Sequence, residues 1–299
     1  MKLGVAIPQR MWPSQEERSF AEAVDFAVRA EALGFDTVWA SDHYFLGFGG
    51  PRLSVGPEPM TLLSFIAGRT ARIGLGTMVL CAPLRPPGAL VREATALADL
   101  SGGRFTLGLG AGWHQPEFEA FAIPTDRLYS RFEEYVEVVG ALLTGEPVDH
   151  EGTYFALRAG QVLGGARPRL LVAAAGPRMI ALAARTADAW SLPGSYEHLG
   201  ARLAQLRHAE AAAGRPAGTV TSGCGAAALL VSAEEGNELL AANPPPTPVA
   251  VGSEQLRSLV DGLAAEGCDE VVLHFSGAVW TGYRDDQLDL AAAALDMGA

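Results

Sequence analysis

Residues 20–44 read FAEAVDFAVRAEALGFDTVWASDHY, and this stretch holds one full unit of the pattern that decides the fold. The apolar residues at positions 20, 24, 27 and 30 recur at the spacing of one helix face, and Gly34 is placed to end that helix. Residues 36–41 then form a short apolar run, which predicts a buried strand. The polar residues Ser41, Asp42 and His43 follow directly at the strand's end.

The same unit recurs along the whole chain of 299 residues. Regular alternation of strand and helix, with no linker between the halves, favours one closed (β/α)8 TIM barrel with long active-site loops and insertions, as a single domain over residues 1–299. We predict strands at 3–7, 36–41, 73–80, 104–109, 170–174, 189–192, within 219–231, and at 270–275. The first predicted helix follows a capping box at 14–17. The other predicted helices span 59–70, 88–100, 127–143, 179–187, 199–213, 253–266 and 285–295. Ser253 is the predicted cap of the helix at 253–266.

Composition narrows the function classes. The chain carries a formal net charge of −12 and has no run of Lys or Arg, so its field repels nucleic acid and anionic membranes. No apolar stretch approaches the roughly 20 residues that cross a bilayer, and the first apolar segment stops at Pro8. We therefore expect a cytoplasmic protein with no nucleic-acid or membrane partner. The three cysteines lack C-x-x-C spacing, which predicts buried thiols and no thiolate metal site.

His43 is the first candidate for chemistry because it follows the second strand, where barrel strands open onto the active-site face. An imidazole at that position suits proton transfer, with Asp42 beside it as a second catalytic candidate. The alternative is that Asp42 and His43 only cap the strand and bond to each other.

Gly108-Leu109-Gly110-Ala111-Gly112 follows the fourth strand but lacks the spacing of a dinucleotide fingerprint. We expect these glycines to let a flat ligand approach the backbone, with Trp113 and His114 at the barrel mouth. His114 and Glu117 resemble a metal pair, yet no third ligand has suitable spacing, so a solvated helix start is the preferred interpretation and no metal is predicted.

Ala175-Gly176-Pro177-Arg178 joins the fifth strand to its helix. Pro177 suits the first helical turn, and free N–H groups at a helix start bind anions, which Arg178 would reinforce. A plain connecting turn explains the same residues equally well.

Several segments together resemble the bacterial luciferase-like monooxygenase superfamily, and Ser41-Asp42-His43 is similar to its coenzyme F420-dependent oxidoreductases. The segments are residues 4–9, 32–43, 101–113, 117–118 and 176–179.

The resemblance implies roles for particular residues. His43 would face the deazaflavin and handle the substrate proton, and Met78-Val79 would form a cis peptide in a bulge under the ring. Ser41, Gly110 and Gly112 would also contact cofactor, and Ala175, Gly176, Pro177 and Arg178 would hold its phosphate. Trp113 stands where F420-dependent sugar-phosphate dehydrogenases have a catalytic Glu, so their acid–base scheme and substrate are not carried over.

The function predicted on this basis is F420-dependent hydride transfer to or from a small, fairly hydrophobic substrate contacted by Tyr44, Trp113 and Trp280. The first alternative is an FMN-dependent monooxygenase that uses O2 and reduced flavin from a partner reductase. The second is a ligand-binding barrel without catalysis, which a His43 turned away from the pocket would favour. A reductase and a homodimer are the protein partners that the resemblance allows.

Overall fold

The fold is taken from a computed structural model that describes residues 1–8, 20–46, 55–194, 196–242, 244–245, 247–275 and 284–297. Eight parallel strands close into a ring in the order β10, β12, β1, β2, β3, β5, β8, β9 and back to β10. This confirms the predicted TIM barrel. The ring strands are β1 (Lys2–Ala6), β2 (Thr37–Ala40), β3 (Gly74–Thr77), β5 (Phe105–Gly110), β8 (Arg169–Ala173), β9 (Ala189–Leu192), β10 (Thr221–Leu229) and β12 (Glu270–His274).

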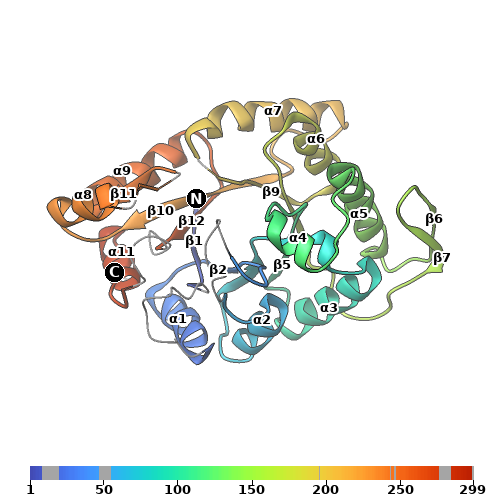
Figure 1. The fold of residues 1–299 in the computed structure, drawn as a ribbon, viewed down its shortest axis with the longest axis horizontal. Helices are drawn as coiled ribbons and strands as arrows, with labels where there is room; N and C mark the ends of the chain where they lie inside the picture. The colour runs from blue at the N-terminus through green and yellow to red at the C-terminus, as the bar shows by residue number, and fades with distance from the viewer. Residues whose placement is uncertain are drawn as a thin grey trace.

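Helices surround the ring of strands, as Figure 1 shows. Their inward faces bury the main hydrophobic core against the outer faces of the strands. The outer helices are α1 (Phe20–Leu33), α2 (Pro59–Ala67), α3 (Pro87–Leu100), α5 (Leu128–Leu142), α6 (Pro177–Thr186), α7 (Leu199–Ala212), α9 (Gly252–Ala265) and α11 (Gln287–Ala294). Gly34 ends α1 with φ of +92°, as its position after the helix predicts.

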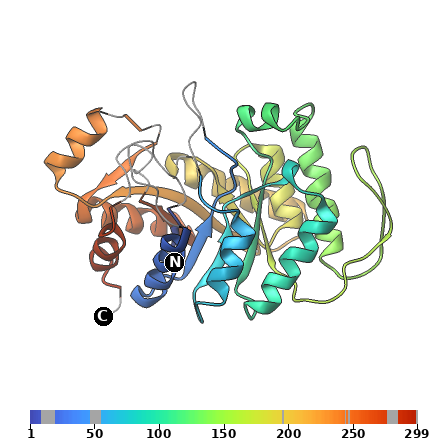
Figure 2. The same ribbon diagram turned by 60° about the horizontal axis from the view of Figure 1, so that its bottom comes forward.

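Smaller elements decorate this frame. The turn at residues 152–155 joins the antiparallel hairpin β6 (Val148–Glu151) and β7 (Ala156–Gly160), which projects from the side of the barrel in Figure 2. The others are β4 (Leu80–Cys81), η1 (Ala82–Leu84), α4 (Gln115–Ala120), η2 (Tyr196–His198), α8 (Ala233–Ala242) and β11 (Val249–Val251). The sequence pattern did not predict α8, because Gly236 is its only buried residue and the helix has no apolar stripe.

Two sequence predictions need correction. Ser253 does not cap α9, since the cap residue is Val251 and Ser253 lies inside the helix. The third strand does not run unbroken to Leu80: β3 ends at Thr77, a cis peptide joins Met78 and Val79, and β4 resumes the pairing with β5. The predicted capping box at 14–17 lies outside the described residues.

A second, smaller core fills the inside of the barrel. Trp39, Leu171, Ala189 and Val272 pack there, with Met78 and Val79 above them. Glycine makes room for the indole, because a Cβ on Gly76 would lie 2.3 Å from Trp39 Cε3. These side chains close the barrel from within and form the floor of the cavity described next. No helix within the described ranges is long and apolar enough to cross a membrane.

Candidate active site

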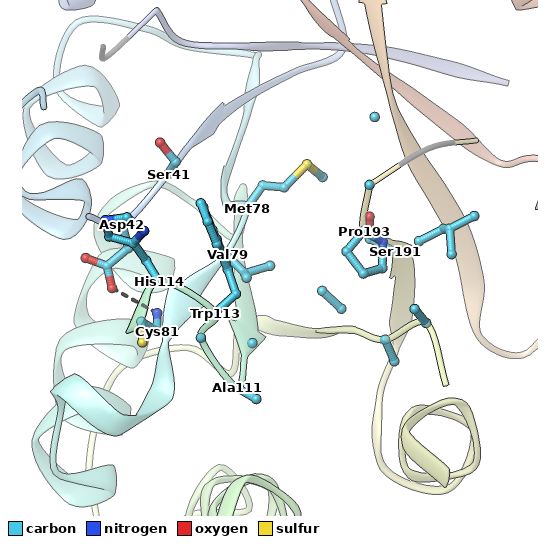
Figure 3. Close-up of a pocket in the computed structure, with 18 of the residues that line it drawn as sticks. Ser41, Asp42, Met78, Val79, Cys81, Ala111, Trp113, His114, Ser191 and Pro193 are labelled. Carbon is cyan, nitrogen blue, oxygen red and sulfur yellow. Dashed lines mark hydrogen bonds between the residues drawn. The ribbon is translucent and has the colours of Figure 1, made fainter. Parts of the chain in front are cut away.

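A cavity of about 770 Å³ opens at the carboxyl ends of the barrel strands. Figure 3 shows residues of β2 and of the β3 and β5 loops on one side, with Ser191 and Pro193 across the space. Most of the predicted site residues line it: Ser41, Asp42, His43, Met78, Val79, Gly110, Gly112, Trp113, Ala175, Gly176, Pro177 and Arg178. The structure therefore brings together residues from four separate loops.

Two predicted substrate residues are placed differently. Tyr44 is 53% exposed and stacks on Phe121, with ring centroids 4.3 Å apart, and it borders a second hollow between α2 and α3. The main chain turns after His43 because Glu117 binds the next two N–H groups, which carries the Tyr44 side chain outward. Trp280 lies outside the described residues.

His43 is held by a carboxylate from a different loop. Its Nδ1 lies 2.9 Å from Oε2 of Glu117, which sits on the short helix α4. The other oxygen of Glu117 accepts hydrogen bonds from the backbone N–H groups of Tyr44 and Phe45. The side chains of His43 and Glu117 are 13% and 6% exposed, so the pair is largely shielded from solvent.

The expectation of a solvated helix start at His114 and Glu117 was wrong. Both residues are buried, at 4% and 5% exposure. The His114 ring packs against Trp113 and Phe45 at centroid distances of 5.0 and 6.0 Å, and burial lowers its pKa. The described residues contain no group of three or more His, Cys, Asp or Glu that could hold a metal. One signal in the sequence could have indicated that Glu117 is buried. Glu117 directly precedes the apolar Phe118, and both lie in a segment that resembles the family.

Asp42 does not bond to His43 but joins a separate ion-pair network. Its carboxylate accepts a hydrogen bond from the backbone N–H of Cys81 at 2.9 Å. It also accepts hydrogen bonds from both terminal nitrogens of Arg85, with Arg85 Nη2 at 3.2 Å from Oδ1. Arg85 also reaches Glu58, 2.9 Å away at the start of α2. Burial alone would lower the pKa of Arg85, but these two carboxylates raise it. Asp42 thus ties the end of β2 to η1 and α2.

The glycines after β5 serve the protein's own packing. A Cβ on Gly110 would lie 2.5 Å from Val79 Cγ2. Gly112 has φ of +82°, and a Cβ there would lie 2.5 Å from Phe118 Cζ and 2.6 Å from Cys81 Sγ. Both glycines also line the cavity. The expectation that they let a flat ligand approach the backbone stays a prediction.

The turn after β8 has the opposite character. Gly176 caps α6 with no side-chain hydrogen bond, and a Cβ built on it meets nothing within 4 Å. Within the described part of the chain, the N–H groups of Ala175, Gly176 and Arg178 have no acceptor. The Arg178 side chain is 58% exposed and bonds Glu133 and Ser130 on α5. This turn offers donors to an anion inside the cavity.

The far wall contains polar residues that the sequence reading missed. Ser191 on β9 is 3% exposed, and His274 ends β12. Gly225 on the neighbouring strand leaves room for that imidazole, since a Cβ there would lie 2.9 Å from His274 Nε2. Both residues line the cavity. Each sits at the end of a strand, which was the available signal.

Comparison with known proteins finds one matching family and several related enzymes. The model of a family described as luciferase-like monooxygenase matches residues 1–243. An F420-dependent glucose-6-phosphate dehydrogenase of Kineococcus radiotolerans is 33% identical over 220 residues, covering 69% of this chain and 63% of the relative. A phthiodiolone/phenolphthiodiolone dimycocerosates ketoreductase of Mycobacterium kansasii is 33% identical over 215 residues, covering 63% of this chain and 58% of the relative. The chain spans between 40% and 63% of the length of the first curated relatives it matches.

Solved structures share the whole barrel. An F420-dependent secondary alcohol dehydrogenase in complex with an F420–acetone adduct superposes with a TM-score of 0.83 at 16% identity, covering 98% of both chains. A monooxygenase from Streptomyces bottropensis gives a TM-score of 0.78 at 24% identity, covering 99% of this chain and 97% of the other. At these identities the likeness establishes a common fold.

Proposed function

This chain belongs to the luciferase-like monooxygenase family, and on that premise we propose that it is a coenzyme F420-dependent oxidoreductase. It would transfer a hydride between the deazaflavin and a small, neutral, fairly hydrophobic organic substrate. The observation that carries the proposal is His43, which lines the cavity with Nδ1 bound to a buried carboxylate. That arrangement suits a group that exchanges a proton with a ligand.

The cavity has features that fit this cofactor at both ends. The open turn at Gly176 presents unpaired backbone donors and Arg178, which suit a phosphate. The Met78–Val79 bulge, whose cis peptide the family resemblance implies, also lines the cavity and suits a flat ring. Ser41 and Gly110 line the same space as the bulge.

Each participant has a limited task in this proposal. Bound F420 would give or accept the hydride at C5 of its deazaflavin ring. His43 gives or takes the proton at the substrate heteroatom, and Asp42 keeps the end of β2 in place through Arg85. Trp113 packs edge-on to His43, with ring centroids 5.5 Å apart, and adds an apolar surface to the cavity lining beside the imidazole.

The charge of the cavity supports a neutral substrate. Among the described lining residues, Arg178 is the only Arg or Lys, and it stands at the turn assigned to the cofactor phosphate. A phosphorylated sugar would need further cations. Ser191 and His274 on the far wall instead suit one carbonyl or hydroxyl group on an otherwise apolar molecule. A neutral ketone or alcohol therefore fits this wall better than a phosphorylated sugar.

FMN-dependent oxygenation is the second candidate, because the donor-rich turn at Gly176 suits the FMN phosphate as well. That activity would require a reductase partner. A cytoplasmic location and a homodimer belong to either version of the proposal.

Fluorescence titration of the purified protein with F420 and with FMN tests the assignment. We expect F420 to bind more tightly. Affinity for FMN equal to or above that for F420 would overturn the cofactor assignment in favour of the monooxygenase. Binding of neither cofactor, in a protein that folds normally, would favour a barrel that binds another ligand.

A further inference from the structure

Glu117 is nearly completely buried, and within the described residues the hydrogen bonds of its carboxylate all go to one short segment, His43 to Phe45. Its Oε1 accepts two backbone N–H groups, and its Oε2 faces Nδ1 of His43 at 2.9 Å. The partners of Oε1 fix the carboxylate in one orientation. Oε2 is therefore held in place against the imidazole.

A carboxylate has no proton to donate at neutral pH, so the nitrogen that faces it must carry one. We propose that Glu117 is a positioning residue that holds the proton of neutral His43 on Nδ1 and leaves Nε2 unprotonated toward the cavity. This inference rests on the proposed function for its catalytic consequence, but the tautomer itself can be measured without any cofactor.

The consequence for the reaction is a defined direction of proton transfer. Nε2 accepts the proton when the substrate is oxidised, and the imidazolium returns it when the substrate is reduced. The negative charge of Glu117 stabilises the imidazolium between these steps. A carboxylate that orients a catalytic histidine acts in the same way in other enzymes. Among the described residues, the rings of Trp113 and His114 lie beside His43, at centroid distances of 5.5 and 6.1 Å.

Glu117→Gln reverses the donor at this contact while it keeps the shape of the side chain. The N–H groups of Tyr44 and Phe45 still require an oxygen, so the amide nitrogen turns toward His43 and donates to Nδ1. The proton of the imidazole then moves to Nε2. Glu119→Gln is the matched control, because Glu119 lies on the same helix, is exposed, and its side chain bonds only Gln115 among the described residues.

The experiment records ¹⁵N histidine spectra of the cofactor-free protein at pH 8 and steady-state kinetics with F420. We expect His43 of the parent to be protonated on Nδ1, and Glu117→Gln to shift that proton to Nε2. We also expect kcat to fall by about 10²- to 10⁴-fold, with F420 affinity within about twofold of Glu119→Gln.

A parent His43 protonated on Nε2 overturns the proposal without recourse to any variant. So does a folded Glu117→Gln protein that retains the parent tautomer. A parent with the expected tautomer but no F420 turnover leaves the positioning role standing and contradicts the proposed function instead.

Discussion

The two glycine-containing turns that border the cavity look alike in sequence and differ in what surrounds them. After β5, Gly110 and Gly112 are hemmed in by Val79, Phe118 and Cys81. After β8, Gly176 has nothing near the position of its missing Cβ and offers backbone donors to the cavity. The first turn packs tightly against the protein's own side chains, and the second has free space beside its glycine.

This difference suggests separate roles for the two turns. Tight packing after β5 fixes α4, which carries Glu117 and through it His43. The group proposed for proton transfer, which needs exact placement, thus belongs to the tightly packed side. The open side is proposed to receive an anion, for which exposed N–H groups and one arginine suffice. Substitutions on the two sides should therefore affect different measurements.

His43→Ala should produce the largest effect and confine it to the chemical step. General acid–base catalysis contributes about 10²- to 10⁴-fold, so we expect kcat to fall by that factor while F420 affinity stays near that of the parent. Steady-state kinetics give kcat, fluorescence titration gives the F420 affinity, and urea denaturation shows whether the variant folds. Near-normal turnover by a well-folded variant would leave His43 without a catalytic role, and loss of the fold would assign it a structural one.

Gly112→Ala compared with Gly176→Ala tests the difference in packing. At Gly112 the left-handed backbone costs about 1–2 kcal/mol for a residue with a Cβ, and the contacts with Phe118 and Cys81 add about 1–3 kcal/mol. We expect the free energy of unfolding to fall by about 3 kcal/mol in urea denaturation. Gly176 has φ of −85°, so alanine there should leave stability unchanged or raise it by up to about 1 kcal/mol. Equal unfolding midpoints for the two variants would contradict the contrast.

The sequence predicted the barrel because the fold depends on local periodicity. Helix faces, strand runs and the end of the first helix at Gly34 are each encoded within a few neighbouring residues. It also predicted that the strand ends carrying His43 and Gly176 would share one face of the barrel, and both residues line one cavity there.

Pairs of side chains that are far apart in the sequence could not be predicted from local patterns. Glu117 lies 74 positions from His43, and Asp42 lies 43 positions from Arg85, so no local spacing links them. The reason for the glycines after β5 was also hidden, since their neighbours come from the bulge and from α4. Conversely, the reach of Arg178 to Glu133 shows that a cation beside an anion site can already have a carboxylate partner.

Arg178→Ala should produce the smallest effect, on cofactor affinity alone. Arg178 is 58% exposed and shares Glu133 with Arg185, whose Nη2 lies 2.8 Å from the carboxylate, so the fold keeps an ion pair when Arg178 is removed. An exposed charge pair is worth about 0.2–1 kcal/mol, which corresponds to a loss of F420 affinity between about 1.4-fold and about fivefold. Arg167→Ala is the control, since that arginine pairs with Asp188 and precedes β8 at the opposite end of the barrel.

Salt separates a direct contact from an indirect one. If Arg178 meets the cofactor phosphate, added salt should weaken binding more steeply in the parent than in Arg178→Ala, because the screened interaction is already missing in the variant. Arg167→Ala should follow the parent at every salt concentration. Identical affinity and identical salt dependence in Arg178→Ala would mean that the backbone donors at Ala175 and Gly176 receive the anion unaided, and that Arg178 serves only its bond with Glu133.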